Sequence, residues 1–313
     1  MIPRRIAYLG PPGTFSEEAL LSQPDLAEAD LLDVATFPEI LLAVSDGTVD
    51  GGFVAIENAI EGSVNVNLDA LVFEHDLFIQ REVVHAIHQH LLAPPGTRVE
   101  AITHVVSFPV ALGQCRAFFR DRLPGVVEVA AASTSDAARL VAAGLAGDGV
   151  FAAVGTALAA KLYDLDVIAP DIDDHRGNAT RFVLVARREA GIPPRTGHDK
   201  TSIACFQHAD APGSLHAILG EFSARAINLT RLESRPTKLE LGQYCFIIDL
   251  DGHIADPVVA HCLRDLHASL ANIKLLGSYP AAGAAAAERR AEVGVAVAAA
   301  DAWIDVLQQA VRP

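Results

Sequence analysis

Short apolar runs alternate with stretches of helical period through the first 190 residues of this chain. A β-branched run bounded by turn residues predicts a buried strand, and an apolar repeat near the helical period predicts a helix. The predicted strands are residues 5–9, 51–56, 77–88, 104–107, 126–131, 151–154 and 181–186. The predicted helices are residues 16–21, 37–46, 64–73, 110–122, 135–143 and 155–162. Such alternation favours parallel α/β layers, because a helix returns the chain between parallel strands.

Two long segments, residues 77–92 and 175–186, are candidates for chain crossings between two α/β lobes. Lobes joined in this way enclose a cleft with a hinge, and Thr180 would stand at that hinge. We therefore predict a two-lobed α/β domain over residues 1–190. The approximate lobe boundaries are residues 1–78 together with 178–190, and residues 79–177.

A polar stretch that contains proline and glycine, residues 191–199, breaks the pattern and is typical of a linker. A second domain is predicted over residues 200–280, with the βαββαβ order of a ferredoxin-like fold. Its predicted elements are strand 201–207, helix 213–225, strands 228–234 and 243–250, helix 257–270 and strand 273–279. Residues 281–313 form an Ala-rich tail, where Trp303, Ile304 and Leu307 share one helical face. A terminal helix or partial disorder is expected there.

The composition narrows the classes of partner. The net charge is -15, which disfavours nucleic acid and anionic membrane, because both require a basic face. An anionic substrate then needs an arginine or the N–H groups of a helix start. The four cysteines lie far apart without a Cys-x-x-Cys motif, so neither a zinc site nor a disulfide framework is expected. The start of the chain has no apolar signal region, and a cytoplasmic location is expected.

Residues 177–185 bring an amide, a hydroxyl and a guanidinium to the mouth of a buried strand. These groups belong to Asn178, Thr180 and Arg181, followed by Phe182. Since α/β proteins place ligands at strand ends, Thr180 is a candidate proton donor or positioning group. Taken alone, the same residues are also compatible with ordinary turn chemistry.

The first predicted strand leads into a glycine-rich turn and then a helix. Gly10 and Gly13 permit a close approach of the backbone to a ligand, and Thr14 or Ser16 would cap the helix beside a carboxylate. A capped turn without a ligand is the alternative. The glycine spacing does not fit a dinucleotide motif, and no Walker lysine follows.

The strand predicted at residues 51–56 is followed by Glu57 and Asn58. Asn58 is the stronger candidate, because an amide can hydrogen-bond a substrate hydroxyl without adding charge. Glu57 is expected to orient its neighbours or relay a proton, with a solvated loop acid as the alternative.

Two further strand ends carry polar groups. Ser107 precedes a predicted helix whose second turn holds Gln114. Ser133, Thr134 and Ser135 open another helix, and such a terminus suits a carboxylate as well as ordinary capping.

His85, His88 and His90 lie close together in the sequence and invite a metal-site interpretation. No carboxylate is evidently placed to complete such a site, so no metal is expected.

In this order, the segments resemble the prephenate dehydratase family. The matching blocks are Gly10 to Ser16, Ile56 to Asn58, Ser107 to Cys115, Ser133 to Ala138 and Thr180 to Phe182. One block departs from the family. Where Ser-His-Pro-Gln is common, this chain has Phe108 in place of the histidine and Val110 in place of the glutamine, so no role is carried over for these two positions. The resemblance implies a periplasmic-binding-protein-like (type II) fold for the two lobes.

The resemblance also implies that prephenate is the substrate and that no cofactor is needed. Thr180, Asn58 and Gln114 are then the catalytic candidates, with Thr180 beside the departing hydroxyl and the two amides on the ring hydroxyl. Arg181 and the helix starts would hold the two carboxylates. The substrate-binding candidates are Thr14, Ser16, Glu57, Ser107, Ser133, Thr134, Ser135, Asn178, Arg181 and Phe182.

The second domain resembles a phenylalanine-binding ACT domain, on Gly213 to His216 and Glu233 to Pro236. This implies L-phenylalanine as an effector and a homodimer or homotetramer through ACT domains, while a dimerisation module without a ligand is the alternative. The candidate effector residues are Asp210, Gly213, Ser214, Leu215, Asn228, Glu233, Ser234 and Arg235. Two other functions stay open for the whole chain: an arogenate dehydratase, and a noncatalytic two-lobed sensor.

Overall fold

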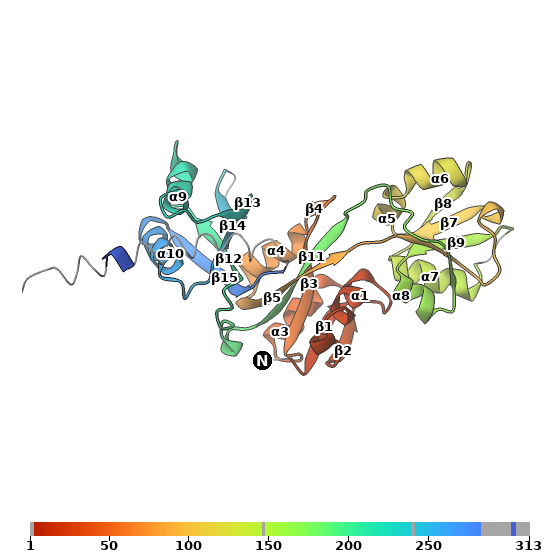
Figure 1. Ribbon diagram of the computed structural model, residues 1–313, viewed down its shortest axis with the longest axis horizontal. Coiled ribbons are helices and arrows are strands. Elements are labelled where there is room, and N and C mark those ends of the chain that lie inside the picture. Colours follow the sequence, from red (N-terminus) through yellow and green to blue (C-terminus); the bar gives the residue numbers. More distant parts are fainter. Residues whose placement is uncertain (1–2, 146–147, 239–241, 283–301, 305–313) are drawn as a thin grey trace, which may run out of the picture. The chain divides into compact units, whose positions relative to one another are not determined.

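The computed structural model describes residues 3–145, 148–238, 242–282 and 302–304 (Figure 1). The chain forms two compact units, one of Met1–Leu77 with Val83–Ala190 and one of Phe78–Glu82 with Gly191–Pro313. No helix in the described part of the chain is both long enough and apolar enough to cross a membrane. The terminal helix predicted around Trp303 lies almost wholly outside the described residues.

The first unit contains two sheets, and the first of them is built around a central buried strand. Its strands, in order across the sheet, are β11 (Ala179–Arg187), β3 (Gly51–Asn58), β1 (Arg5–Leu9) and β2 (Asp30–Val34), with β4 (Gly62–Ser63) on the end of β3. The helices of this lobe are α1 (Phe15–Leu21), α2 (Pro24–Ala27), α3 (Phe37–Ser45), α4 (Asn65–Asp69) and the π-helix η1 (Ala70–Glu74). Phe53 stacks on Phe182 with ring centroids 5.0 Å apart, which fixes β11 against β3 inside the core.

The second sheet belongs to the other lobe of the same unit. Its order is β10 (Asp166–Ala169), β6 (His90–Ala93), β9 (Phe151–Gly155), β7 (His104–Ser107) and β8 (Val127–Ala130). Its helices are α5 (Pro109–Gly113), α6 (Arg116–Arg122), α7 (Thr134–Ala143) and α8 (Ala157–Leu162), with a 3-10 turn η2 (Val99–Ala101). Parallel pairs join β7 to β8 and β9, as the alternation predicted, whereas β6 and β10 run antiparallel.

Some elements differ from the prediction, and β2, β6, β10 and α2 were not predicted. The single strand expected over 77–88 ends at Ala86 as β5 (Leu77–Ala86), and the chain turns before β6. The helix expected over 110–122 is broken at Gln114, which caps α5 instead of lying within a helix. Strand β2 was not predicted, because two aspartates dilute the apolar run of this edge strand.

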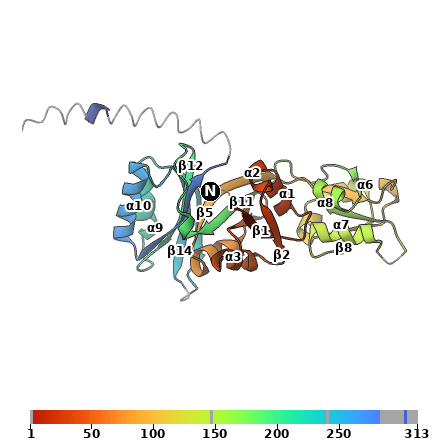
Figure 2. The ribbon, with the colours of Figure 1, turned by 90° about the horizontal axis from the view of Figure 1, so that it is seen from below.

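The second unit has the predicted βαββαβ order. The strands of its sheet, in order across the sheet, are β13 (Leu229–Pro236), β14 (Tyr244–Asp251), β12 (Asp199–Phe206) and β15 (Asn272–Pro280). The 3-10 turn η3 (Arg188–Ala190) ends the first unit along the chain. Helices α9 (Ser214–Ser223) and α10 (Pro257–Ser269) lie side by side and pack on this sheet around Phe222 and Leu266 (Figure 2). Gly277 of β15 pairs with Ile79, and a side chain at Gly277 would come within 2.6 Å of the Ile79 carbonyl.

Candidate active site

The C-terminal end of β3 and the N-terminal end of β11 lie side by side, and Asn58 and Thr180 are register partners there. Asn58 Nδ2 donates to Thr180 Oγ1 and to Asn178 Oδ1, each at 2.9 Å. Asn58 Oδ1 accepts from the backbone N–H groups of Ile60 and Glu61, each at 2.9 Å. These two backbone donors fix the orientation of the amide, so its NH₂ group must face Asn178 and Thr180.

The hydrogen bond from Asn58 also orients the Thr180 hydroxyl. A hydroxyl has one proton and two acceptor lone pairs, and one lone pair of Thr180 is used by Asn58. The Thr180 proton is thereby directed away from Asn58. Thr180 is half-buried, so this proton lies at the edge of the core rather than deep within it.

Gln114 reaches the same place from the other lobe. Its Oε1 accepts from Asn178 Nδ2 at 3.2 Å and from Gln89 Nε2 at 3.4 Å, and its Nε2 donates to Glu61 Oε1 at 3.1 Å. The break between α5 and α6 lets Gln114 reach this place. At the break the Gln114 carbonyl is not used within a helix, and it accepts from the backbone N–H of Asp174 at 2.7 Å. Gln114 therefore bridges the two lobes.

We call Asn58, Gln89, Gln114, Asn178 and Thr180 the amide network. Its members come from distant parts of the sequence, and four of the five are neutral amides. Such groups donate to a developing charge on oxygen without requiring a counter-ion. The arrangement suits a ligand that carries a hydroxyl.

Gln89 and Glu61 were not among the residues predicted for the site. Gln89 is 2% exposed, and its Oε1 has no hydrogen-bond partner among the described residues. Gln89 lies among His85, His88 and His90 in the sequence, and no local sequence pattern indicates that it belongs to a site. Glu61 had a signal, since it follows Asn58 within one loop and its backbone caps the Asn58 oxygen.

Glu57 and Arg181 form a separate pair beside the amide network. Their register positions face each other, and Arg181 Nη1 lies 3.4 Å from Glu57 Oε2. Successive residues of a strand face opposite sides, so this pair is expected on the other face from Asn58 and Thr180. The Arg181 side chain is 9% exposed and that of Glu57 is 40% exposed, so a ligand would reach the carboxylate more easily than the guanidinium.

The start of α1 is organised by its own side chains. Thr14 Oγ1 donates to the Leu9 carbonyl at 3.0 Å and caps the helix by accepting from Glu17 N at 3.5 Å. Glu17 Oε2 accepts from Gly13 N at 2.5 Å, so a carboxylate of the chain already uses this helix start. Burial, with the nearby carboxylates of Glu17 and Asp33, raises the pKa of Tyr8, whose phenol therefore stays neutral. Ser16 is buried in the same turn.

The glycine-rich turn contacts the starts of α7 and α8 in the other lobe. Ser135 Oγ donates to the Pro12 carbonyl, and Thr156 Oγ1 donates to the Gly13 carbonyl at 2.8 Å. Gly13 has φ +90, and a Cβ there would lie 2.7 Å from Ser135 Oγ, so only glycine permits this contact. Ser133 caps α7 by accepting from Asp136 N at 2.9 Å, and Thr134 is buried in the first turn.

Ser107 and Phe182 lie in the cores of their lobes. Ser107 Oγ donates to the Val154 carbonyl at 2.7 Å and is fully buried, while Phe182 stacks in the first lobe. The structure thus brings Asn58, Gln114, Asn178 and Thr180 into one network. It places the other predicted substrate-binding residues in helix caps, lobe contacts or the core.

A cavity of about 840 Å³ lies elsewhere in this unit, and none of the predicted site residues is among the described residues that line it. Its lining residues are Glu18, Leu21, Ser22, His85, Ala86, His88, His90, Ala157, Leu158, Lys161 and Asp171. The expectation that no carboxylate accompanies the histidines was wrong, because His88 Nδ1 lies 3.1 Å from Asp171 Oδ1. Burial lowers the pKa of His90, whose Nδ1 accepts from Asp171 N at 3.1 Å.

The candidate effector residues lie in the second unit, at the start of α9 and along β13. Gly213 has φ +86 at the N-cap of α9, a backbone conformation that favours glycine. Asn228 Nδ2 donates to Asp251 Oδ2 at 2.8 Å, and Glu233 Oε2 accepts from Arg231 at 2.5 Å and lies beside Arg235. The remaining candidates are Asp210, Ser214, Leu215 and Ser234, which are exposed or half-buried.

Comparisons with known proteins agree on one family. The family model described as prephenate dehydratase matches residues 6–190, and the model described as ACT domain matches residues 201–268. A prephenate dehydratase of Mycobacterium tuberculosis is 41% identical over 295 residues, which cover 91% of this chain and 89% of that protein.

Two solved structures with high similarity to the chain carry different descriptions. A prephenate dehydratase of Arthrobacter aurescens in complex with L-Phe has a TM-score of 0.82 and 37% identity, covering 97% of this chain and 99% of that one. GqqA, described as a novel type of quorum quenching acylase, has a TM-score of 0.79 and 31% identity, covering 89% of this chain and 98% of that one.

Proposed function

The chain belongs to the prephenate dehydratase family, and we propose that it converts prephenate to phenylpyruvate with loss of carbon dioxide and water. The bond from the ring to its carboxylate breaks, its electron pair enters the ring, and the ring hydroxyl leaves with a proton. Aromatisation drives the step, so no redox cofactor is required. The barrier lies in expelling hydroxide, which is a poor leaving group.

The hydrogen bond between Asn58 and Thr180 carries this proposal most directly. Thr180 donates to the departing hydroxyl, because Asn58 occupies its lone pair and turns its proton outward. A positioned donor of this kind contributes about 100- to 10,000-fold to the rate. A threonine hydroxyl is weakly acidic, so its placement matters more than its pKa.

The Gln114 amide holds the ring hydroxyl with Asn178 beside it, while Asn58, whose two amide protons bond Thr180 and Asn178, orients these neighbours. Each NH₂ group has two protons, and Gln114 uses one of them on Glu61, so its second proton serves the substrate. Gln89 donates to the oxygen of the Gln114 amide and Glu61 accepts from its nitrogen, so the two fix the amide from both sides. These two are positioning residues.

The two carboxylates of prephenate need local compensation in a chain of net charge -15. The helix starts of α1 and α7 provide it after a rearrangement that frees their N–H groups, and Arg181 contributes positive charge from the other face of the strand pair. The residues at these helix starts are Thr14, Ser16, Ser133, Thr134 and Ser135. Glu57 orients Arg181. Ser107 and Phe182, which are buried, shape the strand ends.

We assign the reaction to residues 1–190 and feedback regulation by L-phenylalanine to residues 200–280, joined by the linker 191–199. The effector is held by the start of α9 and by β13, where Gly213 lets a charged end group approach the backbone and Leu215 supplies an apolar wall. Homodimers or homotetramers form through the ACT domains. The enzyme works in the cytoplasm.

Side-by-side turnover of prephenate and arogenate by the purified chain tests the proposed function. Phenylpyruvate from prephenate at the higher kcat/KM supports it, and preferential formation of phenylalanine from arogenate selects the arogenate alternative. Stoichiometric binding of prephenate without turnover selects the noncatalytic sensor. Adding L-phenylalanine to the same assay is expected to lower the rate of phenylpyruvate formation, because L-phenylalanine is the end product of this pathway branch and feedback inhibition limits its synthesis.

A further inference from the structure

The chain crosses between the two lobes of the first unit twice, and the two crossings are hydrogen-bonded to each other. Ile87 N donates to the Asn178 carbonyl at 2.8 Å, and Ile172 N donates to the Gln89 carbonyl at 2.8 Å. His88 lies on one crossing, and Asp171 and Asp173 lie on the other. We call these three residues the His88 cluster.

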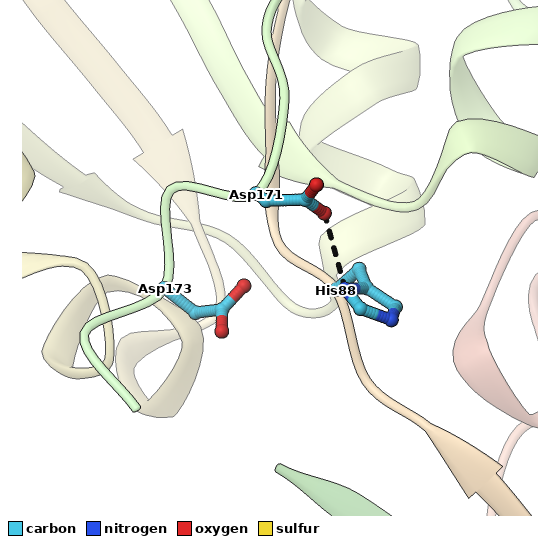
Figure 3. Close-up of side chains that lie close together, drawn as sticks. All are labelled: His88, Asp171 and Asp173. Atoms are coloured by element: carbon cyan, nitrogen blue, oxygen red, sulfur yellow. Dashed lines mark ion pairs between the residues drawn. The ribbon is translucent and has the colours of Figure 1, made fainter. Parts of the chain in front are cut away.

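The ligand atoms of the His88 cluster converge on one small space. One nitrogen or oxygen atom from each residue lies within 4.8 Å of the other two. Figure 3 shows both carboxylates turned toward the His88 ring, and the Asp171 Oδ1 atom is 3.1 Å from His88 Nδ1. Ligands bonded at about 2.1 Å to one divalent metal ion lie about 3 Å apart, so this pair is already at the required separation.

Neighbouring groups hold the Asp173 carboxylate and the backbone of Asp171 in place. Asp173 Oδ1 accepts from the backbone N–H of Gln89 at 3.1 Å, across the two crossings. The backbone N–H of Asp171 donates to His90 Nδ1 at 3.1 Å. Such outer contacts orient ligands before a metal binds and commonly change metal affinity by about 10- to 100-fold.

Charge and access also favour a cation. The cluster combines two carboxylates with one imidazole in a chain of net charge -15. His88 and Asp171 line the cavity of about 840 Å³, which gives an ion an entry path and gives water a route to its remaining coordination positions.

We propose that His88, Asp171 and Asp173 bind one divalent first-row transition metal ion, such as Mn²⁺, Co²⁺ or Zn²⁺. One imidazole with two carboxylates fits these ions better than Ca²⁺ or Mg²⁺, which prefer oxygen alone. The ion would link the two lobe crossings. Because Asp173 contacts Gln89 and Gln89 contacts Gln114, it would also stabilise the amide network from outside. The metal takes no part in the dehydration, so this site stands independently of the proposed function.

Metal titration of the full-length protein tests the proposal. The purified chain is treated with a chelator, dialysed and titrated with MnCl₂, with free Mn²⁺ followed by electron paramagnetic resonance. One Mn²⁺ ion is expected to bind per chain. The variants His88→Ala and Asp171→Asn are each expected to weaken binding by at least about tenfold. CoCl₂ provides a second readout, since bound Co²⁺ should gain a visible spectrum that both variants lose.

His85→Gln is the matched control, because His85 lines the same cavity and pairs with Glu18 at 3.3 Å without belonging to the cluster. This variant is expected to bind Mn²⁺ as the unaltered chain does. The His88 and Asp171 side chains are 56% and 65% exposed, so their replacement should leave the melting temperature of the metal-free protein unchanged. Absence of saturable binding, or equal binding by all three variants, would overturn the proposal.

Discussion

Asn58 Nδ2 donates to Thr180 Oγ1 at 2.9 Å, although 122 positions separate the two residues in the chain. The contact exists because β3 and β11 pair with Asn58 opposite Thr180, at the place where β3 ends and the antiparallel β11 begins. The far lobe adds Gln114 at this place. Buried polar groups are costly unless they are hydrogen-bonded, and this cluster meets that need with bonds among its own members while keeping a second Gln114 amide proton for a ligand, which is why we place the chemistry here.

The variant Asn58→Asp separates the two functions of this side chain. A carboxylate can still accept from the N–H groups of Ile60 and Glu61, but it cannot donate to Thr180 or Asn178. We expect kcat to fall by about 100-fold, with the fold retained. Steady-state kinetics with prephenate and a thermal melt check this, and a large loss of melting temperature with normal kcat would show that Asn58 is structural only.

Gln114 and Glu61 can be tested as a pair. The change Gln114→Glu replaces the donor at 3.1 Å from Glu61 Oε1 by a second carboxylate, and the repulsion should displace residue 114 from Asn178. We expect a fall of at least about tenfold in kcat/KM. Adding Glu61→Gln restores a hydrogen bond of the opposite sense, so the double variant should recover part of the loss. A double variant no better than Gln114→Glu would count against the contact.

Much of the fold could be predicted because its signals are local. The apolar runs that end at Asn58 and precede Gln114 specify strands β3 and β7, and the order of elements after residue 199 specifies the second unit. Strand ends that carry polar residues predicted Asn58 and Thr180 as site residues for the same reason. Their register, however, depends on which strands pair, and sequence spacing does not reveal that.

The unpredicted parts depend on contacts between the lobes. Gln114 was expected within a helix, but the chain breaks there: its carbonyl accepts from Asp174 N, and its side chain reaches Asn178 and Glu61 of the other lobe. Gln89 and Asp171 lie in irregular segments without periodicity, where only the three-dimensional fold brings a partner. The hydroxyls of Ser107 and Ser135 show the opposite case, since the pattern marked them while the structure uses them in backbone contacts.

A buried ion pair should stabilise the second unit. Lys200 Nζ lies 2.8 Å from Glu82 Oε2, and their side chains are 12% and 3% exposed. Removing either charge leaves the other buried, so Glu82→Gln and Lys200→Met should each destabilise by about 3 kcal/mol. The double variant should lose less than the sum, as urea unfolding in a double-mutant cycle would measure. Additive losses would mean that the two charges do not interact.

An exposed ion pair provides the comparison for that cycle. Arg120 and Asp121 are paired at 2.7 Å, but their side chains are 72% and 61% exposed. Water and salt screen such a pair, so Asp121→Asn should leave the urea midpoint unchanged.

The buried thiols of the second unit predict a loss of stability in alkali. Burial raises the pKa of Cys205 from 9.0 to about 12 and that of Cys262 to about 11. Above pH 9 the unfolded chain therefore releases thiol protons that the native chain keeps, so the free energy of unfolding falls as pH rises from about 9 to 11. Urea midpoints at these pH values should show the decrease, and Cys262→Ala should reduce the slope.

The same burial should protect the thiols from reagents. All four cysteines are buried, and only a thiolate reacts quickly. At pH 8 a thiol-specific reagent should label the native protein slowly and the urea-unfolded protein at all four positions. Rapid labelling of the native protein would contradict the packing described for α10 and β12.

The most direct measurement is the rate of phenylpyruvate formation from prephenate by Thr180→Ala and Thr180→Ser beside the unaltered chain. Alanine removes the hydroxyl that Asn58 orients, whereas serine keeps it. We predict that Thr180→Ala lowers kcat by at least about tenfold at an unchanged melting temperature, and that Thr180→Ser retains most of the activity. Near-normal turnover by Thr180→Ala would contradict the account.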